Sequence, residues 1–392
     1  RRSGLSIYND TLETTPHLKL LKSKHGTSFF QFQWGHTNST MTYLSVPSIL
    51  NGISPTNDMT VWTRAPFIWD YASAAGLYTI LVSGSCFQWG GWNTFILRDP
   101  VPDYCYTECH YAEEQAGKSG NLASHQMGLF DDRNTIGRLV DKLDFLQKIN
   151  RHYCAVLHLY GPHYPYWHLL SDRLCKEQTV ISNYRNAIYQ QDKALSVLFQ
   201  YLDATGLLEN TVLIHTSDHG EAFGEHGYFG HLLNFYEEDI GVPIWIYLPS
   251  LVLDRMSEKE RRAIRNNQDK NTSNLDILPT IIDLLDIPVD RNPVSALGGA
   301  SLLREIDPNR LIYISNYNNL QFKTMNQAYA VISDSLKYIY HLKNGRLTTH
   351  CYNFKKDARE AHDLSLTMKH SEALPIKWEL LKNGLGSAEA IP

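Results

Sequence analysis

An acidic residue and a histidine stand side by side, at Asp218 and His219, directly after a short apolar run. That run, residues 211–215, has the aliphatic character of a buried parallel strand. Ligand sites in open α/β sheets form at the carboxyl ends of strands, and a carboxylate with imidazoles suits zinc or a related divalent ion. The glycines that precede His231 predict a loop able to fold back over such a site. The alternative is an Asp that caps a helix, next to a surface histidine.

Strand-like runs alternate with helical patterns along most of the chain. The predicted strands are residues 78–82, 154–160 and 242–247. The predicted helices are residues 136–146, 183–202 and 276–285. This alternation predicts an α/β fold with a mostly parallel central sheet sandwiched by helices. The polar stretch at residues 257–274 is interpreted as a solvated excursion.

The composition changes after Pro288, where turns and two short strand-like pieces follow at residues 311–314 and 337–340. We therefore predict a catalytic α/β domain at residues 1–300 and a small C-terminal subdomain at 301–392 packed on it. The chain has 392 residues, 43% of them hydrophobic, which is ample for a core of that size. The net charge of -5 provides no global basic field, so no nucleic-acid partner is expected.

No apolar run is long enough to span a bilayer, yet the sequence opens with Arg1 and Arg2 rather than Met. We interpret it as a fragment whose missing N-terminal part could hold a membrane anchor. The spacing of the six cysteines matches no zinc framework. Cys105 and Cys109 are close enough for a local disulfide, but the pairing stays open.

Several motifs stand in the order typical of one enzyme superfamily. Residues 217–227, followed by 236–238, resemble the metal-binding signature of the alkaline phosphatase superfamily in its sulfatase-like branch. Residues 161–166 resemble the Pro-His-x-Pro-Tyr element of that branch. Further matches lie at residues 14–18, 48–52, 276–281 and 355–360. The resemblance covers nearly the whole chain and implies the fold of that superfamily.

The nucleophile distinguishes the branches. Sulfatases use a Cys or Ser that is oxidised to formylglycine, and counting back from residues 48–52 places it at Thr42, which cannot be converted. The sulfatase Arg falls at Val46, and the sulfatase Lys falls at His231. Residues 40–47 instead resemble the Thr-x-Thr-Ala-x-Ser-Val-Pro of bacterial phosphoethanolamine transferases. In that family the second Thr is the nucleophile, and histidines occupy the positions of His231 and His163.

The resemblance implies a phosphoethanolamine transferase that works through a covalent phospho-threonine. The implied catalytic residues are Thr42, His163 and His231. The implied metal ligands are Asp218, His219 and Thr42, together with an acidic residue expected just before Arg1. The expected cofactor is Zn²⁺, as one or two ions, or another divalent ion such as Mn²⁺. Such an ion lowers the pKa of a bound hydroxyl and so activates it as a nucleophile.

The implied partners are a phospholipid donor and a cell-envelope lipid or glycan acceptor. The implied location is the bacterial inner membrane, with the catalytic domain in the periplasm. A phosphodiesterase or phosphatase with water as acceptor stays open, as do a sulfatase-like hydrolase and a binding module that has lost its metal. We interpret Glu221 and Glu225 as helix-start or surface acids and His158 as a packing or surface residue. A supporting role for His226 near the metal stays open.

Overall fold

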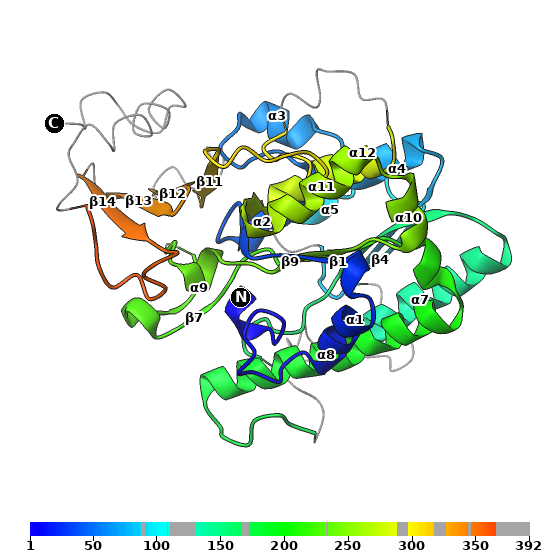
Figure 1. Cartoon of the computed structure of the whole chain (residues 1–392), viewed down its shortest axis with the longest axis horizontal. Helices are drawn as coiled ribbons and strands as arrows, with labels where there is room; N and C mark the ends of the chain where they lie inside the picture. The colour runs from blue at the N-terminus through cyan, green and yellow to red at the C-terminus, as the bar shows by residue number, and fades with distance from the viewer. Residues whose placement is uncertain are drawn as a thin grey trace.

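The computed structural model describes residues 1–87, 91–107, 109, 131–166, 172–232, 234–287, 297–316, 327–343 and 346–365. Figure 1 shows central strands between two layers of helices. On one side lie α1 (Pro16–Lys24), α7 (Asp132–Lys148) and α8 (Val180–Ala204). On the other side lie α2 (Thr42–Asn51), α11 (Glu258–Asn266) and α12 (Ile277–Leu284).

One central sheet is parallel throughout and has the order β4-β3-β5. Its strands are β3 (Tyr78–Ser83), β4 (Tyr104–Thr107) and β5 (Tyr153–His158). The middle strand is a continuous apolar run because both of its faces are covered: Ile80, Leu81 and Val82 are each at most 1% exposed. Ser83 is the register partner of His158. The carboxyl ends of β3 and β5 therefore lie level with each other.

The other central sheet has the order β1-β9-β6, and β9 is antiparallel to both neighbours. Its strands are β1 (Phe29–Phe32), β6 (Leu213–Thr216) and β9 (Ile244–Tyr247). The α/β fold class is confirmed, but the expectation of a mostly parallel central sheet holds only for β4-β3-β5. Both described ladders of this second sheet are antiparallel, including the one that joins β6 to β9. A parallel neighbour needs a crossover connection, usually a long helix. Between β6 and β9 the described chain forms only short elements, so it re-enters the sheet from the end where β6 stops.

The helix layers follow from apolar spacing in the sequence. In α8 the side chain of Thr179 caps the first turn by accepting from the Ser182 backbone N–H. Ala187, Ala194 and Leu198 then fall on one face and are at most 7% exposed. Full burial of a Leu side chain contributes about 1.5–3 kcal/mol, so this face holds α8 against the strands.

Each predicted strand and helix of the main fold is confirmed to within a few residues. The solvated excursion predicted at residues 257–274 is wrong, because it contains α11. The side chain of Ser257 accepts from the Glu260 N–H, the Glu260 side chain accepts in return from Ser257, and Ala263 and Ile264 are fully buried. The chain then continues into β10 (Asn271–Ser273), which pairs in parallel with β2 (Trp34–His36).

A four-stranded antiparallel sheet follows the main fold, in the order β11-β12-β13-β14. Its strands are β11 (Leu311–Ser315), β12 (Gln327–Ser333), β13 (Leu336–Lys343) and β14 (Arg346–Asn353). Ile312 and Ile314 pack in one apolar cluster with Phe235 and Ile240 of the segment before β9. The boundary predicted near residue 300 stays a prediction.

The last two findings concern the disulfide bond and membrane-spanning helices. A disulfide joins Cys86 to Cys109, whereas Cys105 is a free thiol. The pairing that spacing allowed between Cys105 and Cys109 is therefore not the one that forms. Among the residues that the structure describes, no helix combines the length and apolar character required to cross a bilayer.

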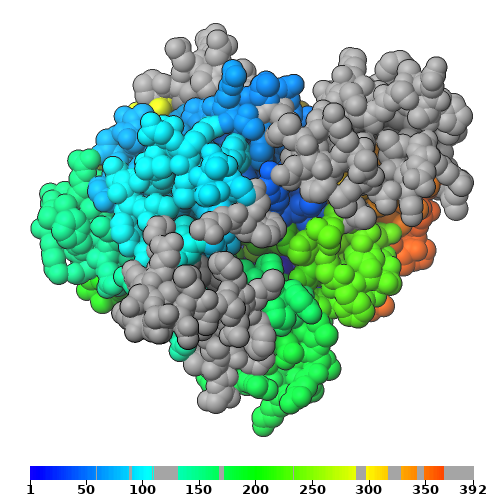
Figure 2. All heavy atoms as spheres, turned by 180° about the vertical axis from the view of Figure 1, so that it is seen from behind, coloured from blue at the N-terminus to red at the C-terminus, as the bar shows by residue number. Residues whose placement is uncertain are grey.

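The short helix α9 (Glu237–Ile240) holds the loop that follows β6. The backbone N–H groups of Gly220 and Glu221 donate to the carbonyl oxygens of Asp239 and Glu238 at 2.6 and 2.8 Å. This approach is so close that a Cβ on Gly220 would lie 2.0 Å from the Glu238 carbonyl oxygen. Figure 2 shows the yellow-green α9 region against the orange atoms of the C-terminal sheet.

Gly220→Ala should destabilise this loop, since its Cβ would overlap the backbone of α9. Overpacking of this kind costs about 1–3 kcal/mol, so we expect a lower midpoint in thermal unfolding. Gly137→Ala is the matched control, because it lies in α7 and its Cβ would meet nothing within 4 Å. The control should leave the midpoint unchanged or raise it. An unchanged midpoint for Gly220→Ala would mean that the loop is not held by α9.

Candidate active site

Thr42 is the first residue of α2, and Met41 precedes it as the N-cap. The helix forms because Val46 and Leu50 face the core, and it ends where Gly52 adopts the left-handed conformation with φ 70°. The start of a helix carries free backbone N–H groups and the positive end of the helix dipole, which favour an anion such as a phosphoryl group. The local fold therefore places the Thr42 hydroxyl where a phosphoryl oxygen is stabilised.

Asp218 and His219 lie in the loop that follows β6. His219 Nε2 is 2.8 Å from Thr42 Oγ1 and 3.3 Å from Asp218 Oδ2. On the other side of the ring, His219 Nδ1 is 2.8 Å from the Gly220 carbonyl oxygen. Because a carbonyl oxygen only accepts, this contact requires the proton on Nδ1 and leaves Nε2 with a lone pair. The structure thus brings the three predicted ligands together.

The donor set fits a divalent ion. Bonds of 2.0–2.1 Å around a tetrahedral zinc place neighbouring donor atoms about 3.3 Å apart, close to the separations between His219 Nε2 and its two neighbours. Within the described ranges, no group of three or more His, Cys, Asp or Glu side chains is placed to hold a metal. The Thr42 hydroxyl and a further donor are therefore needed to complete four ligands, as zinc requires.

The start of the chain lies beside this donor set. Arg1 lines the same cavity as Thr42 and Asp218, and its backbone nitrogen donates to Tyr184 Oη at 2.5 Å. Its guanidinium pairs with Glu225 at 2.6 Å. The acidic ligand expected just before Arg1 stays a prediction.

Buried hydroxyl and amide groups anchor the backbone at Asp218. Ser45 Oγ donates to the Asp218 carbonyl oxygen at 2.7 Å, and the Thr37 hydroxyl donates to the same oxygen. Asn274 Nδ2 donates to the Ser217 carbonyl oxygen at 3.5 Å. Ser45, Thr37 and Asn274 are fully buried. Because they bind main-chain oxygens, they fix the loop and leave the Asp218 carboxylate free for a metal.

His231 reaches the site from the loop after β8 (Phe229–Gly230). Its ring centroid lies 3.9 Å from that of His219. Its Nδ1 lies 3.0 Å from Glu221 Oε1, and Glu221 Oε2 accepts from the Tyr166 hydroxyl at 2.9 Å. Glu221 is 6% exposed, so its interpretation as a surface or helix-start acid is wrong. Sequence spacing gave no sign of its two partners, which stand 10 and 55 positions away.

His163 and His158 border the site from the β5 side. His163 lies on the exposed loop after β5, and its Nδ1 is 2.6 Å from the Tyr164 carbonyl oxygen. His158 ends β5, and its Nδ1 is 2.8 Å from Ser83 Oγ. Burial lowers the pKa of His158, whereas the nearby Asp218 carboxylate opposes that shift. His158 therefore packs, as the sequence suggested, but it also lies close to the proposed metal ligand.

His226 lies farther from the donor set. Its Nδ1 is 2.6 Å from Glu238 Oε1, its Nε2 is 3.0 Å from the Arg359 carbonyl oxygen, and its ring stacks on Tyr236 at 3.6 Å. The role left open for it near the metal is thus at most indirect. Glu225 is 37% exposed and follows the expectation for a surface acid.

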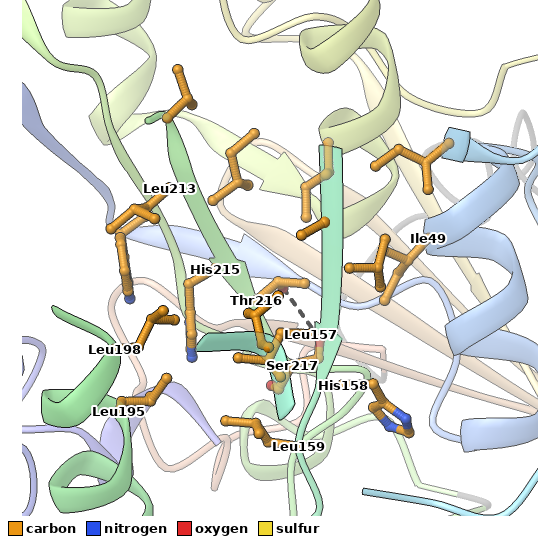
Figure 3. A pocket seen from close by; sticks show the side chains of 18 of the residues that line it. Ile49, Leu157, His158, Leu159, Leu195, Leu198, Leu213, His215, Thr216 and Ser217 are labelled. Atoms are coloured by element: carbon orange, nitrogen blue, oxygen red, sulfur yellow. Dashed lines mark hydrogen bonds between the residues drawn. The ribbon is translucent and has the colours of Figure 1, made fainter. Parts of the chain in front are cut away.

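A cavity of about 1580 Å³ extends from this site between β5 and β6. Its polar end is lined by Thr42, Asp218, His219 and His231. Figure 3 shows aliphatic side chains that line this cavity, among them Leu157 of β5, Leu159 just after it, and Leu195 and Leu198 of α8. The candidate catalytic side chains thus line the same cavity as this apolar surface.

Burial and hydrogen bonding act against each other on the acids of the site. Burial alone would raise the pKa of Asp218, but His219 and the Thr42 hydroxyl hold it below its usual value. The same competition at Glu221 also ends in a lowered pKa, because of the hydrogen bonds from His231 and Tyr166. Asp239 differs: burial, reinforced by Glu238, raises its pKa to about 8. Asp218 and Glu221 are therefore anionic at neutral pH, as a metal ligand and a hydrogen-bond acceptor must be.

The pattern that defines the sulfatase family matches residues 1–287. The chain belongs to the sulfatase family. It is 26% identical over 199 residues to an N-acetylglucosamine-6-O-sulfatase of Bacteroides thetaiotaomicron, a match that covers 48% of this chain and 32% of that protein. This sulfatase-family chain thus matches about a third of that curated relative's length.

Solved structures of the alkaline phosphatase superfamily share the fold of this sulfatase-family chain. The phosphonate monoester hydrolase of Agrobacterium radiobacter has a TM-score of 0.70 at 15% identity, covering 100% of this chain and 94% of that chain. The C-terminal periplasmic domain of EcEptC from Escherichia coli, solved in complex with Zn, has a TM-score of 0.60 at 17% identity, covering 85% and 89%. The predicted membership of the sulfatase-like branch is confirmed.

Ser45→Ala should weaken zinc binding, because it removes a hydroxyl that holds the Asp218 backbone in place. Loss of a group that orients a metal ligand typically costs 10–100-fold in affinity, and we expect about tenfold here. Ser48→Ala is the matched control: Ser48 is also a buried serine of α2, but its hydroxyl bonds to Trp62 Nε1 at 2.9 Å. Chelator competition should show weaker binding for Ser45→Ala alone. Equal zinc affinity in both variants would contradict the anchoring role.

Proposed function

We propose that this protein is a metal-dependent phosphoethanolamine transferase that works through a covalent phospho-threonine. The donor is a phospholipid and the acceptor a cell-envelope lipid or glycan. The observation that carries the proposal is the 2.8 Å contact of Thr42 Oγ1 with His219 Nε2. Thr42 stands at the position where a formylglycine-based sulfatase needs a Cys or Ser. The resemblance of residues 40–47 to phosphoethanolamine transferases supports transfer.

Zinc is the proposed ion, as one or two per site, with Mn²⁺ as the alternative. The carboxylate–imidazole–hydroxyl donor set supports a borderline-soft divalent ion. The Zn in the similar EcEptC domain points the same way. When bound, such an ion lowers the pKa of the Thr42 hydroxyl and polarises the phosphoryl group.

Each residue of the site then has a separate proposed role in the reaction. Thr42 supplies the oxygen that bonds phosphorus, while the start of α2 stabilises the phosphoryl oxygens. His231 donates a hydrogen bond or a proton to the oxygen that leaves. His163, on the exposed loop after β5, is the residue proposed to meet the acceptor. In the second half of the cycle an acceptor hydroxyl takes the group from Thr42.

The proposed location is the periplasmic side of a bacterial inner membrane. The disulfide between Cys86 and Cys109 supports an oxidising compartment, since such bonds persist outside the cytosol. The similar EcEptC domain is periplasmic. Anchoring through a segment before Arg1 remains part of the proposal.

Exposed apolar side chains beside the candidate histidines support a lipid donor. Tyr164 follows His163 and is 66% exposed. Phe229 and Leu232 flank His231 and are 69% and 46% exposed. Exposed large apolar side chains next to the residues of a polar site are typical of contact with a lipid or another apolar surface. We therefore propose that these side chains form a rim that contacts the acyl region or the membrane surface.

Hydrolysis is the second candidate, with water in place of the acceptor hydroxyl. The fold shared with a phosphonate monoester hydrolase keeps it in consideration. The two differ only in the second half-reaction, because both need Thr42 as nucleophile. Whether the group carried by Thr42 passes to an acceptor hydroxyl or to water therefore distinguishes transfer from hydrolysis.

Thr42→Ala should abolish turnover of phosphatidylethanolamine, because it removes the hydroxyl that lies 2.8 Å from His219 Nε2 and serves as the proposed nucleophile. The expected loss in kcat is at least about 10⁴-fold, whereas Thr42→Ser should keep measurable turnover. Intact-mass and peptide analysis of the wild type should find phosphoethanolamine on Thr42. Full activity of Thr42→Ala would overturn the assignment, and release of free phosphoethanolamine with no modified acceptor would favour hydrolysis.

Phe229→Ser should raise KM several-fold for phosphatidylethanolamine in vesicles, because it removes an exposed ring at the rim. For a short-chain, water-soluble diester both kcat and KM should stay unchanged. Phe145→Ser is the matched control, since Phe145 is 50% exposed on α7, away from the site. Equal effects of both variants on vesicle substrate would contradict a specific lipid-contacting rim.

A further inference from the structure

A chain of hydrogen bonds connects the two candidate histidines through a tyrosine and a carboxylate. The backbone N–H of Tyr166 donates to the His163 carbonyl oxygen at 2.8 Å. The Tyr166 hydroxyl donates to Glu221 Oε2 at 2.9 Å. Glu221 Oε1 then accepts from His231 Nδ1 at 3.0 Å. The chain joins the loop after β5 to the loop after β8.

Tyr166 and Glu221 are fixed more firmly than ordinary loop residues. They are 5% and 6% exposed, and the Tyr166 ring packs against Tyr184 and Phe223 at centroid distances of 5.5 and 5.8 Å. The backbone of Tyr166 has a φ of 62°, a region that a bulky residue rarely adopts. Such strain persists only where the surrounding structure over-determines it, and it clusters at functional sites.

The carboxylate also determines which nitrogen of His231 is available. An ionised carboxylate only accepts hydrogen bonds, so His231 Nδ1 carries a proton. The other nitrogen, Nε2, is then the one left for the substrate. A carboxylate that orients an imidazole in this way also stabilises the positive charge the ring can acquire.

We propose that Glu221 and Tyr166 are positioning residues that hold the His231 ring so that Nε2 faces the oxygen leaving phosphorus. The inference deepens the proposed function and rests on it for the role of His231. As the bond from Thr42 Oγ1 to phosphorus forms, the bond from phosphorus to the leaving oxygen breaks. The Thr42 hydroxyl proton passes to water. His231 Nε2–H gives its proton to the leaving oxygen, and the ring becomes neutral while Nδ1–H stays bonded to Glu221.

The test compares two phosphodiester substrates in the full-length, zinc-loaded protein. Phosphatidylethanolamine has an alkoxide leaving group that needs a proton. A p-nitrophenyl phosphodiester has a stable leaving group that needs none. Protonation of the leaving group therefore accelerates turnover of phosphatidylethanolamine much more than turnover of the aryl diester. A merely structural defect lowers turnover of both substrates alike.

Glu221→Ala should lower kcat on phosphatidylethanolamine roughly 10- to 100-fold, with little change in KM and at most about threefold loss on the aryl diester. Glu221→Gln should recover most of that loss, because its amide oxygen still accepts from His231 Nδ1. Tyr166→Phe should fall between them, since the ring packing is kept and only the hydroxyl is removed. Tyr153→Phe is the matched control: its hydroxyl bonds to Thr211 at 3.0 Å, and β5 begins there, away from the site.

Three results would overturn the inference. The first is wild-type kcat for Glu221→Ala on phosphatidylethanolamine. The second is an equal loss on both substrates, and the third is an equal loss for Glu221→Ala and Glu221→Gln. Any of them would mean that this carboxylate does not orient His231 for catalysis.

A readout without substrate separates this inference from the proposed function. In ¹⁵N-histidine-labelled protein, the wild type should show a protected imidazole N–H signal that disappears in both His231→Ala and Glu221→Ala. If this signal is present while phosphatidylethanolamine is not turned over, the proposed function fails and the hydrogen bond stands. If the signal is unaffected by Glu221→Ala, the positioning inference fails whatever the substrate.

Discussion

The contact between the start of α2 and the loop after β6 is the constraint on which the site depends. It joins Thr42 to His219, which are separated by 177 positions. Neither side chain could hold the other in place by a single hydrogen bond, which contributes about 0.5–1.5 kcal/mol. The register is set instead by several buried groups together: the hydroxyls of Ser45, on the next turn of α2, and of Thr37 both donate to the Asp218 carbonyl oxygen. Helix and loop therefore meet through buried groups that take no part in the chemistry, which leaves the reactive oxygen and nitrogen free.

A second set of contacts supports the same loop from the C-terminal side. Glu237 of α9 lies 3.0 Å from Arg2 and 3.4 Å from the fully buried Lys337 of β13. Burial opposes ionisation of Glu237, but Lys337 and the other nearby cations hold its pKa at about 2. Lys337 also contacts Glu360 at 2.5 Å. Buried ion pairs contribute little net stability, yet removing one partner leaves an unpaired buried charge and is costly. These buried ion pairs thus hold the C-terminal sheet against α9. Because α9 contacts the loop at Gly220, they also support that loop.

The sequence was sufficient for the features whose signals are local. Apolar runs and periodicity placed β3, β5, β6, β9 and the helices α7, α8 and α12, but not β1 or β4. Ordered motifs placed Thr42 and the Asp218–His219 pair. The helix α11 was missed although its Ser257–Glu260 capping box is visible, because only a few apolar residues mark its buried face. Glu221 was misjudged for a different reason. Its role depends on a tyrosine 55 positions away, and only folding reveals that pairing. The partner of Cys86 in the disulfide could not be predicted for the same reason, since it depends on which cysteine lies nearby in the folded chain.

The two candidate histidines differ in how they are held, and this difference suggests different tasks. His231 bonds to a buried carboxylate, so its ring has one orientation at low energetic cost. His163 is exposed, and among the described residues its Nδ1 contacts the carbonyl oxygen of its own neighbour, Tyr164. A general acid must be placed to within a few tenths of an ångström, whereas a group that meets a varied acceptor gains from freedom. The backbone bond from Tyr166 limits that freedom, because it ties the His163 loop to the same carboxylate that orients His231. A shift of the His163 loop should therefore act on the orientation of His231 through Tyr166 and Glu221.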